Sequence, residues 1–117
     1  MRAYELMIIY RGDLAEDEVE EPLGRAVSSL ASLGVQVDSD RINRWPKRRF
    51  AYEIDHRSEG YYVVIEFVCS GVDFSGFERS LRLNDAVVRH KLIRLPDSEA
   101  ARRGLLEPAP DPVPADA

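Results

Sequence analysis

The chain has 117 residues, of which 44% are hydrophobic and 32% charged, and its formal net charge is -5. This length supports one hydrophobic core, and the lack of any run of about 18 apolar residues excludes a membrane-spanning helix. The single cysteine, Cys69, excludes a disulfide within the chain and fits a reducing cytoplasm. We expect no secretory signal, because Glu5 interrupts the apolar patch at the start of the chain.

The first two predicted elements are a strand and an amphipathic helix. Residues 1–10 alternate between two faces, and one face is fully apolar, as in a half-buried strand. Apolar residues then recur at three- and four-residue spacing, which is typical of a helix: Val19, Leu23, Ala26, Val27, Leu30 and Leu33. Pro22 belongs in the first turn of a helix, so regular helix is expected from about Glu20 to the stop signal at Gly34.

The middle of the chain predicts two further strands. Residues 35–54 have strand-like spacing on both sides of Pro46, which favours an edge or bulged strand with Phe50, Tyr52 and Ile54 as its apolar positions. Residues 55–60 are polar and are predicted to turn. Residues 61–69 form the strongest strand pattern in the chain. Its one charge, Glu66, marks the outward face, so the inward residues are Tyr61, Val63, Ile65, Phe67 and Cys69.

The last two predicted elements are a helix over residues 73–83 and a strand over residues 86–95. The resulting order, β-α-β-β-α-β, predicts an α+β ferredoxin-like sandwich: a four-stranded antiparallel sheet with two helices on one face. We assign this domain to residues 1–95. Residues 96–117 are rich in proline and acid and are expected to be a flexible tail that orders on a partner, with one or two helical turns within residues 98–106.

The sequence offers no pattern of an active site, a metal site or a cofactor site. The two histidines, His56 and His90, have no second ligand at metal spacing, and His90 reads as a partly buried strand residue. Acidic neighbours such as Glu20 and Glu21 are more typical of a solvated helix face than of a catalytic pair. No glycine-rich phosphate loop or nucleophile elbow is present. We therefore predict that the protein is not an enzyme.

Two groups of basic residues stand out in this acidic chain. The first lies around Pro46 and contains Arg44, Lys47, Arg48 and Arg49, with Trp45 and Tyr52 nearby as bases for stacking. The second lies on the first and last strands and contains Arg2, Arg89, Lys91 and Arg94. In a ferredoxin-like sheet the last strand pairs beside the first, so the second group can form a row that suits an RNA backbone.

Non-functional explanations fit the same residues. Arginines on an edge strand guard against aggregation, Arg48 and Arg49 can pair with the acidic helix, and Trp45 can belong to the core.

Three stretches resemble the bacterial small-subunit ribosomal protein number six family over about residues 1–95. They are MRAYELMII at the start, RWPKRRFAYEI in the middle and LRLNDAVVRHKLIR at the end. They are similar to the family patterns Met-Arg-x-Tyr-Glu, Trp-Gly-x-Arg-x-Leu-Ala-Tyr-x-Ile and Asn-Asp-x-Val-x-Arg. Pro46 stands where the family usually has glycine, and Phe50 where it usually has leucine.

The resemblance implies a non-enzymatic subunit of the cytoplasmic ribosome. Family members bind the central domain of small-subunit ribosomal RNA, near the platform, together with small-subunit ribosomal protein number eighteen. By position, the resemblance implies RNA contacts at Arg2, Arg89 and Arg94, and weaker ones at Arg48 and Arg49. Lys47 and Lys91 are added here from their charge and face. The exposed strand face and the C-terminal extension are where the protein partner is expected.

Three other kinds of protein have the predicted fold. An RNA-recognition-motif domain needs a basic residue before the glycine of EGYYVVIEF, and this chain lacks one. In addition, Glu66 would repel phosphate from the exposed face of the sheet. An acylphosphatase-like enzyme needs an arginine-bearing phosphate loop, for which residues 11–13 are too short. The main alternative is a ferredoxin-like protein-interaction or regulatory domain without RNA binding.

Overall fold

The elements follow the predicted order, with one additional strand and one additional helix. The computed structural model describes residues 1–54 and 56–107. Within them the chain forms β1 (Arg2–Arg11), η1 (Glu16–Val19), α1 (Glu20–Ser32), η2 (Ser39–Arg41), β2 (Ile42–Arg44), β3 (Arg48–Ile54), β4 (Arg57–Cys69), α2 (Ser75–Leu83), β5 (Val87–Arg94) and α3 (Asp97–Arg102).

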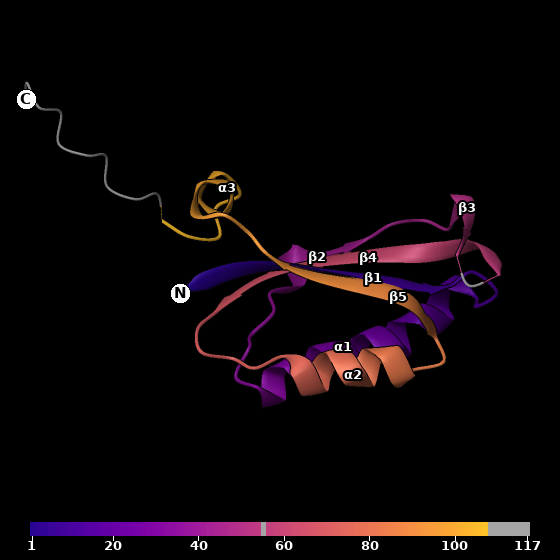
Figure 1. Cartoon of the computed structure of the whole chain (residues 1–117), viewed down its shortest axis with the longest axis horizontal. Helices are drawn as coiled ribbons and strands as arrows, with labels where there is room; N and C mark the ends of the chain where they lie inside the picture. Colours follow the sequence, from indigo (N-terminus) through magenta and orange to yellow (C-terminus); the bar gives the residue numbers. More distant parts are fainter. Residues whose placement is uncertain (55, 108–117) are drawn as a thin grey trace, which may run out of the picture.

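The strands form one antiparallel sheet in which β1 and β4 are central. β5 pairs with the free side of β1, and both β2 and β3 pair with β4 at the other edge. Figure 1 shows α1 and α2 together on one side of this sheet. The ferredoxin-like α+β fold is therefore confirmed, with the predicted second strand divided into β2 and β3 because Pro46 cannot donate a hydrogen bond between them.

The main core lies between the sheet and the two helices. Alternate residues of β1 and β4 face the helices and are almost fully buried, among them Leu6, Ile8, Val63 and Ile65. The helices contribute Leu23, Leu30, Phe77 and Leu81 to the same cluster. The predicted inward face of β4 is confirmed, and the opposite face of the sheet, which carries Glu5 and Glu66, is called the open face below.

The connection from α1 to β4 differs from the prediction in three respects. Val35 is buried but belongs to no strand. The predicted turn over residues 55–60 is wrong from Arg57 onward, because β4 already begins there and pairs with β3. Tyr52, predicted as a fold-forming position, has 76% of its surface exposed, whereas Phe50 is buried.

One end of the open face is covered by β3. A Cβ atom placed on Gly60 would lie 2.9 Å from Phe50 Cζ and 2.8 Å from Ile9 Cγ2, so the Phe50 ring packs directly over the Gly60 backbone. Figure 1 shows β3 rising above β4 on the side away from α1 and α2. Ile9 is consequently buried even though it projects away from the main core.

The other end of the open face is covered by α3, on the side of the sheet opposite α1 and α2 in Figure 1. A second apolar cluster joins Ala3, Leu95 and Ala100, with Val68, Leu105 and Leu106 packed against it. α3 thus lies within the region expected to be a tail and contains the expected helical turns. The boundary at residue 95 stays a prediction, and residues 108–117 lie outside the described residues.

The close packing at Gly60 makes a prediction for stability. Gly60→Ala should lower the free energy of unfolding by about 1–3 kcal/mol, because the new methyl group would contact the Tyr10 carbonyl, Ile9 and Phe50. Gly24→Ala is the control: this exposed position in α1 has no atom near the new methyl group and should gain up to about 1 kcal/mol. Denaturant unfolding measures both, and an unchanged stability for Gly60→Ala would show that Phe50 does not cover this glycine.

Candidate nucleic-acid interface

The edge strand β5 carries three of the predicted site residues. Arg89 and Lys91 pair with Ile9 and Met7 of β1. Paired residues of an antiparallel ladder project to the same face, so these two cations lie on the open face. Arg94 pairs with Tyr4, and Arg2 pairs with Cys69 of β4, which places both at the end of the sheet on the side of the helices.

The four cations of this group are exposed and free to bind an anion. Within residues 1–54 and 56–107, none of them has an ion pair to a carboxylate: Arg2, Arg89, Lys91 and Arg94. They are called the β5-edge group below. Several other arginines of the chain do form ion pairs, for example Arg11 with Asp13 at 3.2 Å.

The second predicted group, Lys47, Arg48 and Arg49, lies at the opposite edge of the sheet. Arg48 pairs with Gly60, and Gly60 pairs on its other side with Arg11. Arg11 is the last residue of β1 and Arg2 is the first, so Arg48 and Arg2 lie at opposite ends of the sheet. Lys47 Nζ is 3.9 Å from Glu59 Oε1. The structure therefore keeps the two predicted groups apart, at opposite edges of the sheet.

Trp45 and Arg48 form a stacked pair next to β2. The Arg48 guanidinium lies 4.4 Å from the centroid of the Trp45 ring, and Tyr62 is 5.7 Å from the same ring. Trp45 keeps 37% of its surface exposed, so the alternative that it is a core residue is wrong. The ion pair to the acidic segment is made by Arg44, whose Nε is 2.6 Å from Glu20 Oε1.

An apolar strip remains on the open face between α3 and β3. It contains Met7 of β1, Tyr62 and Val64 of β4, Trp45, and Ile93 of β5, which is 39% exposed. Arg89 and Lys91 border the strip on the β5 side. This arrangement places an apolar contact surface directly beside unpaired cations.

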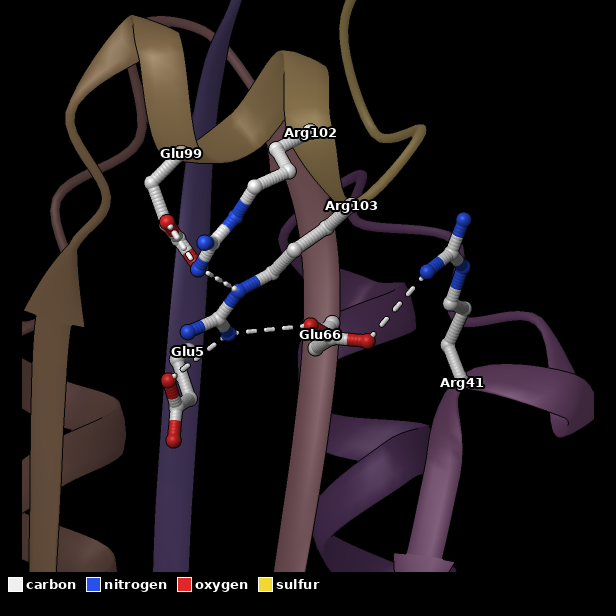
Figure 2. A network of polar contacts seen from close by, with 6 residues as sticks. All are labelled: Glu5, Arg41, Glu66, Glu99, Arg102 and Arg103. Carbon is white, nitrogen blue, oxygen red and sulfur yellow. Dashed lines mark hydrogen bonds and ion pairs between the residues drawn. The ribbon is translucent and has the colours of Figure 1, made fainter.

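The two carboxylates of the open face are already bound by arginines. Figure 2 shows Arg103, which follows α3, between Glu5 of β1 and Glu66 of β4, with Arg41 on the far side of Glu66. Arg103 also donates from Nε to Glu99 at 2.7 Å, and these hydrogen bonds raise the pKa of Arg103 above its ordinary value. Hydrogen bonds from Arg102 and Arg103 lower the pKa of Glu99.

Sequence reasoning missed two further cations, Arg79 and Arg82 on α2. Both are exposed, and neither has an ion pair within the part of the chain that the structure describes. The sequence signal that could have found them is their three-residue spacing on the predicted helix, which places both on the same side of that helix. α2 is tied to β5 by His90, whose Nε2 is 3.1 Å from Glu78 Oε1; the expectation that His90 is a partly buried strand residue is confirmed.

The described residues show no cluster of three or more side chains suited to holding a metal ion. None of the helices in residues 1–54 and 56–107 is long and apolar enough to cross a membrane.

Comparison with known proteins decides the family. The family model described as Ribosomal protein S6 matches residues 3–94. The chain belongs to the ribosomal protein S6 family. It is 40% identical over 94 residues to small ribosomal subunit protein bS6 of Carboxydothermus hydrogenoformans, covering 80% of this chain and 96% of that protein. It is 42% identical over 98 residues to bS6 of Beutenbergia cavernae, covering 84% of this chain and 99% of that protein.

A solved member of the family has the same fold. The crystal structure of 30S ribosomal protein S6 from Thermotoga maritima superposes with a TM-score of 0.76 at 31% identity, covering 88% of this chain and 95% of that chain. The S6 family consists of structural proteins of the small ribosomal subunit, so this chain is a ribosomal constituent and not an enzyme.

The stacked pair of Trp45 and Arg48 makes a prediction for fluorescence. Trp45 is the one tryptophan of the chain, so its emission reports on this position alone. Arg48→Ala should move the emission maximum to longer wavelength, because removal of the guanidinium exposes a ring face to water, and should cost about 0.5–1 kcal/mol of stability. Arg49→Ala, on the next residue and the opposite face of β3, is the control and should leave the emission unchanged. Equal shifts in the two variants would contradict the stacked geometry.

Proposed function

We propose that this S6-family protein binds the central domain of small-subunit ribosomal RNA, near the platform, together with small-subunit ribosomal protein number eighteen. The observation that carries the proposal is the β5-edge group: four exposed cations that lack ion pairs within the described ranges and lie on adjoining strands. Family membership supports the ribosomal setting in which such a group would act.

The RNA contacts are assigned to cations according to their pairing in the structure. Arg2, Arg89 and Arg94 are the principal contacts, since guanidinium groups bind phosphate with two parallel hydrogen bonds. Lys91 joins them because it lies beside Arg89 on the open face. Lys47, Arg48 and Arg49 are secondary contacts, because they lie at the opposite edge of the sheet from the β5-edge group, and in addition Lys47 is close to Glu59 and Arg48 is stacked on Trp45.

The protein partner is assigned to the apolar strip and the C-terminal segment. Ile93 and Trp45 are large side chains left partly exposed at the β5 side and the β2 side of the strip, so a protein that covers the strip would reach the β5-edge group and the bound RNA. In this division, residues 1–95 carry the RNA contacts and the segment that begins at residue 96 is assigned to the partner.

The small number of phosphate contacts predicts joint binding. Three to five contacts give a slope of the logarithm of affinity against the logarithm of salt of roughly -3 to -5, which is shallow for an RNA-binding protein. The chain alone, with a net charge of -5, should therefore hold RNA weakly. A partner that brings further contacts would raise the affinity of the pair.

The test is RNA binding by this chain, with and without small-subunit ribosomal protein number eighteen, on a central-domain RNA fragment at several salt concentrations. We expect weak binding alone and strong binding of the pair. Arg89→Ala should weaken binding of the pair and make the salt slope shallower by about 1, while thermal stability stays within about 0.5 kcal/mol.

Arg25→Ala is the matched control, because it removes the same charge from an exposed site on α1, in the helix layer. It should leave RNA binding unchanged. Nanomolar binding by the chain alone in physiological salt would contradict joint binding. A large loss of stability in Arg89→Ala without an effect on RNA would make Arg89 a structural residue.

A further inference from the structure

Two glutamates face each other at the centre of the open face. Glu5 of β1 is the direct cross-strand partner of Glu66 of β4. Like charges directly opposite each other on one face of a sheet are destabilising, and here they also lie beside the cations proposed to bind RNA. The pair needs a counter-charge. A cation of β5 that supplied it would no longer be available to bind RNA, so the counter-charge has to come from elsewhere.

Arg103 supplies that counter-charge from the C-terminal segment. Its Nη1 donates to Glu5 Oε2 at 2.9 Å and to Glu66 Oε2 at 3.0 Å, while Arg41 Nη1 is 3.3 Å from the other oxygen of Glu66 (Figure 2). These side chains are only about one-fifth to one-third exposed, so water screens them less than it screens surface pairs.

Apolar packing holds Arg103 in this position. Ala100 of α3 has no exposed surface and packs against Ala3 and Leu95, and Gly104 closes α3 with a positive φ of 75°. A helix of six residues is marginal alone, so α3 depends on this docking for its structure. The packing and the ion pairs therefore fix the Arg103 side chain over the sheet together.

Lys91 is the β5 cation that Glu5 would otherwise attract. Glu5 pairs with Ile93, and Met7 pairs with Lys91, so Glu5 and Lys91 are diagonal neighbours on the same face. Diagonal neighbours are about 7–8 Å apart, within reach of a glutamate and a lysine. Within the described residues, however, Glu5 pairs with Arg103 and Lys91 has no ion pair.

We propose that Arg103 is a positioning residue for RNA binding: by holding Glu5, it keeps Lys91 available for a phosphate group. This inference rests on the proposed function and extends it to the C-terminal segment. Arg103 itself does not need to contact RNA. Its role is to remove the negative charge that would otherwise compete with phosphate for Lys91.

The test compares two arginines of the full chain, bound with small-subunit ribosomal protein number eighteen to the central-domain RNA fragment. Arg103→Gln should weaken binding about two- to fivefold and make the salt slope shallower by about 1, because Glu5 then captures Lys91. Arg25→Gln is the control: it removes the same charge from an exposed ion pair with Glu21 on α1, outside the surfaces proposed to bind RNA or the partner. It should leave binding within about twofold.

A double variant separates an electrostatic role from a purely structural one. Glu5→Gln combined with Arg103→Gln restores the net charge and removes the competitor of Lys91, so binding should return to the wild-type value. The double variant also relieves the repulsion between Glu5 and Glu66, and it therefore decides the question even if Arg103→Gln alone fails to fold.

Equal effects of the two single variants, or a double variant that still binds weakly, would overturn the inference. Failure of the wild-type pair to bind the RNA would instead contradict the proposed function, so the two failures are distinguishable.

Discussion

The pairing of β1 with β4 is the interaction on which the remaining structure depends. Ten residue pairs, from Arg2 opposite Cys69 to Arg11 opposite Gly60, join the two central strands without a break in register. A shift by one residue would move every side chain of a strand to the other face. The same register that directs Leu6 and Ile65 into the core also places Glu5 opposite Glu66 on the open face, and it positions β1 to align the cations of β5.

Local pattern was sufficient to predict most of this arrangement. Alternation along β4, with Glu66 marking the outward side, predicted which residues are buried, and helical spacing predicted α1 with its start at Glu20. The strand order follows from the ferredoxin-like topology, so the position of β5 beside β1 could be predicted as well. These features depend either on residues that are close in sequence or on a common topology, and both can be identified from a single sequence.

The covering of the open face could not be predicted in the same way. Phe50 reaches it from β3, which rises above β4 in Figure 1, and Gly60 leaves room for the ring; neither residue alone indicates the other. Arg103 contacts Glu5 across 98 residues of chain, and α3 forms where composition indicated a tail. The two groups of basic residues were found from sequence, but the face of the sheet to which Arg2, Arg89, Lys91 and Arg94 project required the register of β1 with β4 and β5.

The central claim is that the β5 edge of this S6-family protein faces RNA in the small subunit, while the layer of α1 faces away from it. Protein–RNA crosslinking of small subunits assembled with this chain tests it most directly, with the crosslinked residues identified by mass spectrometry. The account predicts that the chain sediments with the small subunit and that crosslinks concentrate at β5 and the start of β1. Crosslinks confined to α1, or failure to sediment with the subunit, would contradict it.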